Sequence, residues 1–200
     1  MTEVENICID DTVLVRQCRS GDAAAMERLI LKYQDRIHNL ILKICQNPDD
    51  AAELTQDTFV KIIENLDNFQ ARSGFYTWAF RIAVNLTLNH CKRARRLTFS
   101  SIDADQADAG DGAVQLKEIL ADKSSPDPAI IAQTAELCEL VQKGLMKLDD
   151  DHRAVIVLRD IEGMNYDQIA DVLNMPLGTV KSRLSRARSS LADIMEALVE

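Results

Sequence analysis

The spacing of hydrophobic residues along this chain follows a helical repeat in two long stretches. From residue 11 to residue 96, apolar residues recur every three to four positions, as they do on one face of an α-helix. Breaks at "SGD", "NPDD" and "DNFQARSG" divide this stretch into four predicted helices, which end near residues 20, 45, 66 and 96. Asn47 is placed to cap the third of them, with Pro48 at its first position, where a missing N–H costs nothing.

The repeat is lost between residues 98 and 128, where Asp, Ser, Ala and Gly dominate and large apolar residues are scarce. Such a composition is typical of a flexible segment. Helical periodicity returns in residues 129–200, first through 130–148, then through 151–161, and then in two shorter signals. The pattern predicts an all-α protein: two small helical domains, residues 1–97 and 129–200, joined by a flexible acidic linker.

Composition supports a folded helical chain. Hydrophobic residues make up 46% and charged residues 28%, and there are only seven Gly and four Pro. The opening "MTEVENICIDD" has no positive end and no apolar run. No stretch reaches the roughly eighteen apolar residues that a membrane span requires. We therefore expect a cytoplasmic protein that is not inserted in a membrane.

Residues that carry chemistry are few and scattered. The cysteines are odd in number, widely spaced and without a CxxC pair: Cys8, Cys18, Cys45, Cys91 and Cys138. The three His residues lack HExxH or HxxxH spacing, and no Walker loop or GxSxG elbow is present. We expect reduced structural thiols, no metal, no cofactor, no small-molecule substrate and no catalytic residues, which makes an enzyme the least supported class.

The net charge of -9 at first argues against a nucleic-acid partner. The charges are segregated, however. Two stretches hold basic residues and no acidic ones. The first contains Arg81, Lys92, Arg93, Arg95 and Arg96. The second contains Lys181, Arg183, Arg186 and Arg188. Acidic stretches run from residue 49 to 67 and from 103 to 111. This distribution indicates two basic surfaces, at least one acidic surface and several partners.

The stretch "GMNYDQIADVLNMPLGTVKSRLSRARSSL" has the most specific local signals in the chain. Asn165 and Gln168 have the spacing of a capping box at a helix start. Asn174, which tolerates left-handed geometry, and Pro176 then break the helix. A second helix is predicted to begin near Gly178.

The two faces of that second helix differ in chemistry. Its core face is predicted to hold Val180, Leu184, Ala187 and Leu191. The opposite face and its flanks hold Thr179, Ser182, Ser185, Arg186 and Ser189, with Lys181, Arg183 and Arg188. Short hydroxyl side chains let a helix approach base edges, while Lys and Arg reach phosphates. This is typical of a helix-turn-helix recognition helix; the alternative is a helical hairpin with a solvated basic face.

Most of the scarce aromatic residues lie in "FYTWAFRIAVN", residues 75–85. One stripe of this helix suits a core: Phe75, Ala79, Ile82 and Leu86. A second stripe changes from aromatic to polar to basic: Trp78, Arg81, Asn85, Asn89, Lys92 and Arg96. Aromatic rings stack on unpaired bases, amides bond base edges and cations hold phosphates, so this stripe suits single-stranded or melted DNA. Core aromatics followed by a solvated basic segment remain the alternative.

Four segments, taken in order, give a family resemblance. "GDAAAMERLILKYQDRIHNL", "DAAELTQDTFVKIIENLDNF", "FYTWAFRIAVNLTLNHCKRARR" and "LDDDHRAVIVLRDIEGMNYDQIADVLNMPLGTVKSRLSRARSSL" closely resemble an extracytoplasmic-function (ECF) sigma factor of bacterial RNA polymerase. The match covers nearly everything except the first ten residues and the linker. The resemblance implies that the first domain is sigma region 2, which binds polymerase and captures the minus-ten promoter element. It also implies that the second is sigma region 4, which reads the minus-thirty-five element.

The resemblance also assigns roles to residues at matching positions. The matching acidic helix would contact polymerase. The candidate contact residues are Asp50, Glu53, Gln56, Asp57 and Lys61. A merely solvated acidic face is the alternative. Melted DNA would meet Trp78, Arg81, Asn85, Asn89, Lys92, Arg93 and Arg96, next to a loop at residues 68–74 that matches the family's base-capturing loop. Duplex DNA would meet Thr179, Lys181, Ser182, Arg183, Ser185 and Arg186.

The expected partners are core RNA polymerase, promoter DNA and, as in many relatives, an anti-sigma factor. Two other classes stay open. A stand-alone helix-turn-helix regulator would explain the C-terminal half but would leave the stripe from Trp78 to Arg96 without a role. A pure protein-interaction adaptor would make no sequence-selective DNA contact.

Overall fold

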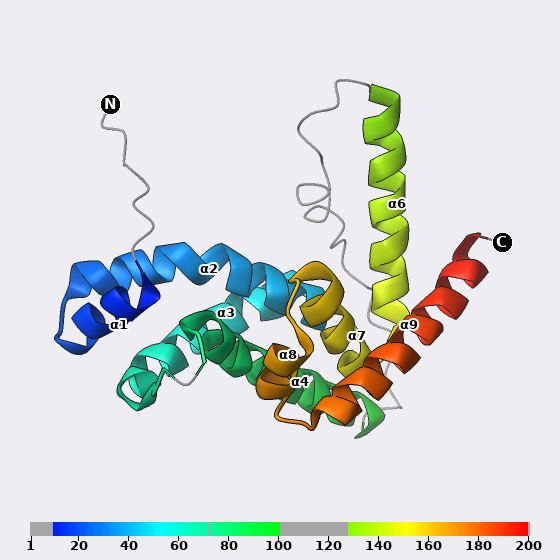
Figure 1. Ribbon diagram of the computed structural model, residues 1–200. Coiled ribbons are helices and arrows are strands. Elements are labelled where there is room, and N and C mark those ends of the chain that lie inside the picture. The colour runs from blue at the N-terminus through cyan, green and yellow to red at the C-terminus, as the bar shows by residue number, and fades with distance from the viewer. Residues whose placement is uncertain (1–9, 72, 101–127, 200) are drawn as a thin grey trace.

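The computed structural model describes residues 10–71, 73–100 and 128–199, where the regular elements are all helices (Figure 1). The first part contains α1 (Asp11–Arg19), α2 (Ala23–Cys45), α3 (Pro48–Asn65), the short 3-10 helix η1 (Leu66–Asn68) and α4 (Phe75–Ser100). The four predicted helices are therefore confirmed. The last of them continues to Ser100, beyond the expected boundary at residue 97.

Side-chain caps fix where these helices begin. Asp22 accepts hydrogen bonds from the backbone N–H groups of Ala24 and Ala25 at the start of α2. Asn47 accepts from Asp49 and Asp50 at the start of α3, and Pro48 occupies the first turn, as predicted. These bonds satisfy backbone donors that the helix itself cannot pair.

The second part contains α6 (Pro128–Lys147), α7 (Asp150–Ile156), the π-helical turn η2 (Val157–Ile161), α8 (Tyr166–Leu173) and α9 (Leu177–Val199). The predicted turn between the last two helices is confirmed. Asn165 and Gln168 form a reciprocal capping box, and Asn174 adopts left-handed geometry with φ 49°. Val180, Leu184 and Ala187 are buried on the core face of α9, as predicted, while Leu191 of the same predicted face is only half-buried.

The second of the two shorter helical signals corresponds to α9, which has 23 residues. Its C-terminal half continues past the helix-turn-helix and crosses α6 (Figure 1). The crossing is close: a Cβ on Gly144 of α6 would lie 2.8 Å from the Met195 sulfur and 3.1 Å from a Leu191 methyl carbon. The part of α9 beyond the turn motif is therefore packed against α6. Most of the expected linker, residues 101–127, lies outside the described residues.

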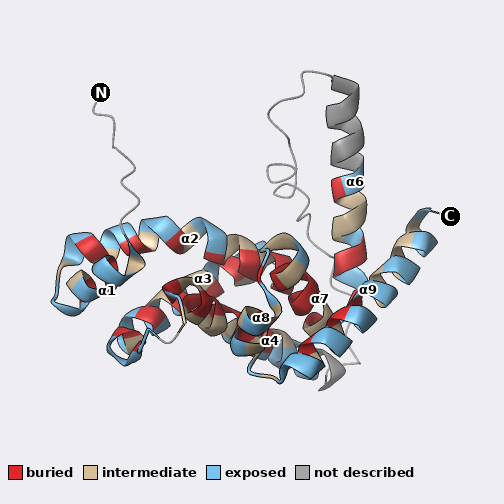
Figure 2. Cartoon of the chain, in the orientation of Figure 1, coloured by how far each residue is buried: buried red, intermediate tan, exposed pale blue. Residues whose placement is uncertain are grey.

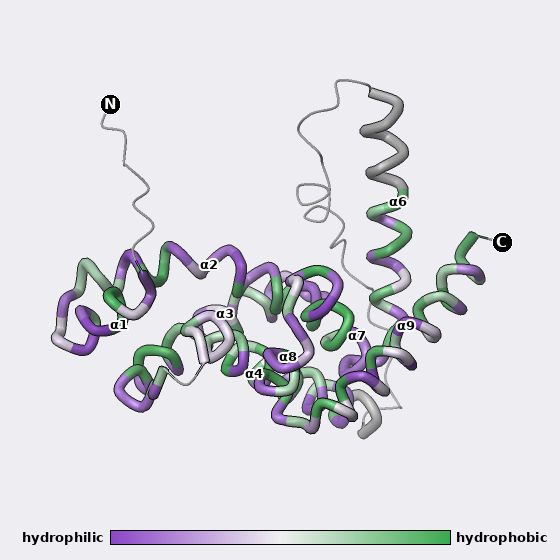
Figure 3. Tube along the Cα trace, in the orientation of Figure 1, coloured by the Kyte–Doolittle hydropathy of each residue, from purple (hydrophilic) through white to green (hydrophobic). Residues whose placement is uncertain are grey.

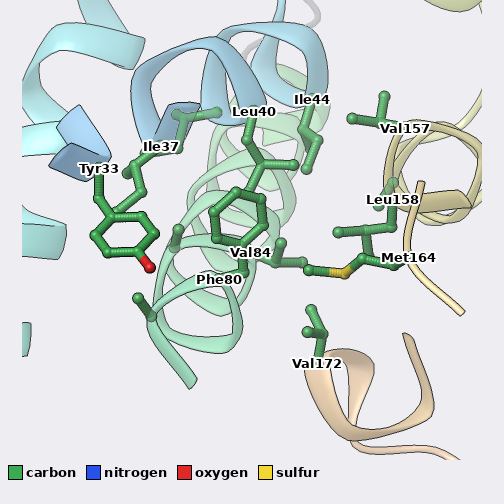
Figure 4. Close-up of a cluster of buried hydrophobic side chains, with 14 of the residues drawn as sticks. Tyr33, Ile37, Leu40, Ile44, Phe80, Val84, Val157, Leu158, Met164 and Val172 are labelled. Carbon is green, nitrogen blue, oxygen red and sulfur yellow. The ribbon is translucent and has the colours of Figure 1, made fainter. Parts of the chain in front are cut away.

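One hydrophobic core runs through both parts of the chain. Hydrophobic positions recur along the helices (Figure 3), and the buried ones gather where α2, α3, α4 and α7 meet (Figure 2). In Figure 4, residues from α2 and α4 face residues from η2, α8 and the intervening loop. The labelled residues are Tyr33, Ile37, Leu40, Ile44, Phe80, Val84, Val157, Leu158, Met164 and Val172. Each large buried aliphatic side chain contributes roughly 1.5–3 kcal/mol, so the two helical parts are packed together and not merely tethered.

The prediction for the core face of α4 is only partly right. Phe75 and Ala79 are buried, but Ile82 and Leu86 are only half-buried. The remaining buried apolar residues of α4 are Phe80, Ala83, Val84 and Leu88. Helices α2 and α3 pack on one side of α4 and α8 packs on another, so the buried arc is wider than one stripe. None of the described helices is long and apolar enough to span a membrane.

Candidate nucleic-acid interface

A groove of about 360 Å³ lies between α3 and α4. Its lining residues are Lys61, Asn65, Asn68, Trp78, Ile82, Asn85 and Leu86. Trp78 is held against the core from behind, with its ring centroid 5.1 Å from that of Phe69 and 5.7 Å from that of Phe75. The groove therefore combines a braced aromatic face, amides and a cation, a set of groups suited to stacking and hydrogen bonding with an unpaired base.

The loop after α3 is held by Arg19, a residue that the sequence analysis did not single out. The Arg19 guanidinium donates to the backbone carbonyls of Leu66 (2.8 Å) and Asp67 (3.3 Å), and also to that of Phe69. Phe69, a residue of the loop itself, is buried. Because Arg19 is 47 positions away from Leu66, no local sequence pattern indicates this contact.

Phe75, Tyr76 and Phe80 of α4 serve packing. Phe75 and Phe80 are buried, and the Phe75 ring centroid lies 5.3 Å from that of Tyr33. The Arg36 guanidinium lies 4.4 Å from the centre of the Tyr76 ring, and the Tyr76 hydroxyl donates to Glu162 at 3.3 Å. Burial, followed by the charge of Glu162, raises the pKa of Tyr76, so this phenol stays a neutral donor. Among Phe75, Tyr76, Trp78 and Phe80, it is Trp78 that lines the groove.

The predicted basic stripe of α4 is partly covered by the second part of the chain. Asn85, Asn89, Arg93 and Arg96 are exposed, as a DNA contact requires. Arg81, in contrast, is half-buried and donates to the Asp171 carbonyl of α8 at 2.7 Å. The Lys92 ammonium lies 3.4 Å from an Asp151 oxygen of α7, and the neighbouring Arg95 pairs with Asp150.

The predicted recognition face of α9 is largely open. Lys181, Ser182, Ser185 and Arg186 are exposed, while Thr179 is half-buried. Two of the flanking cations, Arg183 and Arg188, form ion pairs within the protein. Arg183 lies 3.8 Å from Asp151, the same residue that pairs with Lys92 of α4. Arg188 pairs with Asp160, and this hydrogen bond raises the pKa of the guanidinium.

The acidic helix α3 presents most of its predicted contact residues to solvent. Glu53, Gln56, Asp57 and Lys61 are exposed, and Lys61 pairs with Glu64 at 2.8 Å. Asp50 stands apart because it is half-buried, with its carboxylate 3.1 Å from His90 Nε2.

The sequence analysis missed two exposed apolar residues on α3, Val60 (51% exposed) and Ile63 (46%). Apolar residues at these positions look like core residues in a helical repeat, and only the packing of α3 shows that they face outward. Within residues 10–71, 73–100 and 128–199, no group of three or more His, Cys, Asp or Glu side chains has the arrangement of a metal site.

Comparison with protein families matches both halves of this architecture. A model for sigma-70 region 2 matches residues 29–97, and a model for sigma-70 region 4 matches residues 138–191. The RNA polymerase sigma-H factor of Pseudomonas aeruginosa is 36% identical over 190 residues, covering 94% of this chain and 95% of the relative. The ECF RNA polymerase sigma-E factor of Escherichia coli is 33% identical over 192 residues, covering 96% and 97%.

Two solved structures share the fold. CnrH, solved with the cytosolic domain of CnrY, aligns with a TM-score of 0.62 and 26% identity over 94% of this chain and 97% of that one. The sigma factor RpoE from Bartonella quintana, solved with the anti-sigma factor NepR, aligns with a TM-score of 0.64 and 24% identity over 85% and 96%. The all-α fold with two sigma-type helical domains is therefore confirmed.

Proposed function

From the premise that this chain belongs to the sigma-70 family, in the ECF group, we propose which of its surfaces performs each step of sigma function. The chain is an alternative sigma factor, a class of protein that binds core RNA polymerase and directs initiation at specific promoters. Each domain is assigned the role of the sigma region that it matches. Residues 1–97 form the region 2 domain and residues 129–200 form the region 4 domain, with the linker at 98–128 between them.

Region 2 captures an unpaired base of the minus-ten element in the groove between α3 and α4. The observation that carries this assignment is the convergence of Trp78, Asn85 and Lys61 on one groove. The Trp78 ring provides a stacking face and Asn85 offers an amide to a base edge, while Lys61 lies at the edge of the groove, next to the polymerase face of α3. Further along α4, the melted strand follows Asn89, Lys92, Arg93 and Arg96, while Arg81 becomes available only if α8 moves.

Region 4 reads the minus-thirty-five element with α9. Its exposed hydroxyl and basic side chains are grouped on one face, and they leave room for close approach in a major groove. The contact residues are Thr179, Lys181, Ser182, Arg183, Ser185 and Arg186. Arg183 must exchange its contact with Asp151 for a phosphate when DNA binds.

Core polymerase binds the outer face of α3. Glu53, Gln56, Asp57 and Lys61 supply polar contacts, and the exposed Val60 and Ile63 supply apolar area between them. A mixed face of this kind is typical of a protein interface. We place Asp50 at its edge because His90 already engages that carboxylate.

The protein performs no covalent chemistry, acts in the cytoplasm and is held in check by an anti-sigma factor. Support for the last point comes from CnrH, which was solved in complex with another protein and shares 26% identity with this chain. A stand-alone helix-turn-helix regulator is disfavoured, because the relatives match region 2 as well as region 4.

The first test is run-off transcription from a genomic fragment library with purified core polymerase, with and without this protein, followed by mapping of RNA 5′ ends. We expect discrete new starts that share two upstream elements. Combined Lys181→Ala/Arg186→Ala substitution should abolish them, and Trp78→Ala should reduce them by about tenfold or more, since one stacked base is worth roughly 1–3 kcal/mol.

Arg28→Ala is the matched control, because it removes an exposed cation of α2 that belongs to neither DNA surface. It should leave the starts unchanged. Absence of new starts with the wild-type protein would overturn the sigma assignment. Unchanged starts with Trp78→Ala would overturn the assignment of the groove.

A further inference from the structure

We propose that Arg19 is a positioning residue for base capture: from the end of α1, it fixes the η1 turn that forms one wall of the groove between α3 and α4. This inference rests on the proposed function, because it concerns how the groove assigned to the minus-ten element keeps its shape. Arg19 does not line the groove, and none of the DNA contacts expected from the sequence lies on α1.

The Arg19 guanidinium binds three backbone carbonyls of the segment that follows α3. It donates through Nη2 to Leu66 at 2.8 Å and Asp67 at 3.3 Å, through Nε to Leu66 at 3.1 Å, and also to Phe69. Asn68, which lines the groove, lies inside this bonded segment. Because a planar guanidinium presents its donors in a fixed fork, the three carbonyls are held in one arrangement.

The bonded segment also supports the stacking face of the groove. Phe69 is buried, and its ring centroid lies 5.1 Å from that of Trp78 and 5.8 Å from that of Phe75. The Phe69 N–H donates to the Leu66 carbonyl at 3.1 Å, the same oxygen that Arg19 binds. Arg19 therefore acts on the Trp78 ring through one backbone turn and one buried aromatic ring.

A residue with strained backbone geometry follows in the same loop. Ala71 has a φ of 52°, in the left-handed region that residues with a β-carbon seldom adopt. Such geometry persists only where the surrounding structure imposes it, and it is concentrated at ligand-binding segments. The bonds from Arg19 end two residues earlier, at Phe69, and supply that constraint on one side of the loop.

Helix α1 is itself firmly placed, so Arg19 bonds the loop from a fixed position. The buried face of α1 packs in the core beside α2 (Figure 1). In its first turn, Asp11 accepts a hydrogen bond from the Tyr33 hydroxyl at 2.5 Å and pairs with Lys32 at 2.7 Å. Arg19 is the last residue of α1, so the helix is attached to α2 at its start and to the loop at its end.

The first measurement uses the free full-length protein and needs no polymerase. Trp78 is the only tryptophan in the sequence, so its emission reports directly on the groove. In Arg19→Gln, the partly buried Leu66 and Phe69 carbonyls lose their donor, and the segment rearranges to hydrate them. Time-resolved anisotropy should therefore show more nanosecond motion of the Trp78 ring than in the wild-type protein.

The second measurement tests base capture, with holoenzyme and promoter DNA. A promoter mapped by run-off transcription supplies fork-junction duplexes in which each non-template position of the minus-ten element is made abasic in turn. The ratio of affinities for intact and abasic DNA measures what the captured base contributes, and any loss of folded protein affects both DNAs equally. Arg19→Gln should lower the largest of these ratios by about three- to tenfold, because the groove is then formed in only a fraction of the molecules.

Arg16→Gln is the matched control, because it removes the same charge from an exposed position in the last turn of the same helix. It should leave both the anisotropy and the affinity ratio at wild-type values. Arg19→Lys keeps the charge and should recover part of the ratio, since an ammonium also donates to carbonyls but lacks the fork of the guanidinium. The inference is overturned if Arg19→Gln matches Arg16→Gln in either measurement.

Sigma function and the role of Arg19 are tested separately. Absence of new starts with the wild-type protein would contradict sigma function, while the anisotropy of Trp78 would still test the effect of Arg19 on the groove. Normal starts with an unchanged affinity ratio in Arg19→Gln would overturn the positioning role alone. An equal loss of affinity for intact and abasic DNA would also overturn it, since Arg19 would then act through its charge or through folding.

Discussion

The position of Cys91 at the boundary between the two domains strongly changes the pKa of its thiol. It borders a cavity of about 320 Å³ that is also lined by Cys45, His90, Asp150 and Arg153. Burial, followed by the charge of Asp150, raises the pKa of the Cys91 thiol to about 12. Burial also raises the pKa of Cys45. Both thiols are therefore kept protonated by their position at the boundary between the two domains.

We predict that Cys91 in the native protein reacts very slowly with iodoacetamide at pH 8. Raising its pKa from 9.0 to about 12 lowers the fraction of reactive thiolate by roughly 10³. The measurement is peptide mass spectrometry after timed labelling, with protein in urea at the same pH as the control. Labelling at the rate of the unfolded chain would contradict the prediction.

The raised pKa of Cys91 also determines in which direction the free energy of unfolding changes with pH. Above pH 9.0, the unfolded chain releases the Cys91 proton while the folded chain retains it until about pH 12. The contribution of Cys91 to the free energy of unfolding is therefore present below pH 9 and falls as the pH rises through that window.

At the scale of elements, α6 and α9 cross closely at Gly144, a residue that has no side chain. Gly144 lies where α6 meets Leu191 and Met195 of α9. This contact lies in the part of α9 beyond its predicted recognition face.

We predict that Gly144→Val lowers the free energy of unfolding by about 1–3 kcal/mol, because a branched side chain at this crossing overpacks it. Gly178→Val is the matched control, since a Cβ there meets nothing within 4 Å, and its effect should stay within about 0.5 kcal/mol. Urea unfolding followed by circular dichroism measures both variants. Equal effects at the two glycines would show that the crossing is loose.

At the scale of the whole molecule, the two domains share a core and a charged boundary. Glu162 lies 3.5 Å from Lys43 and 3.4 Å from Arg36, so region 4 also contacts α2 through ion pairs. Burial lowers the pKa of Lys43, although the charge of Glu162 opposes that effect. The boundary therefore combines apolar packing with partly desolvated charges.

We predict that the free protein unfolds in a single cooperative transition. A continuous core makes each domain lose buried apolar area when the other unfolds, so the calorimetric and van't Hoff enthalpies should agree. Differential scanning calorimetry measures both. Two separated transitions would indicate domains that are stable independently, and the shared core would then contribute little.

The sequence alone determined the helices, their caps and the chemistry of their faces. Asn47, the capping box of Asn165 and Gln168, and the turn at Asn174 act through contacts within a few residues, which a local pattern contains. The burial of Val180, Leu184 and Ala187 followed from helical periodicity in the same way. The resemblance to sigma factors, confirmed by the family match, rests on these ordered local motifs.

Tertiary structure alone decided which predicted residues are free and which are engaged. Nothing in the local pattern links Asp151 to Lys92 and Arg183, Arg81 to the Asp171 carbonyl, or Arg19 to the loop beyond α3. Periodicity also could not show that α4 is buried on two sides, so it misplaced half of the core stripe. The physical reason is the same throughout: a helix repeat records that a face is apolar or charged, but the partner of that face is chosen by packing between segments far apart in the chain.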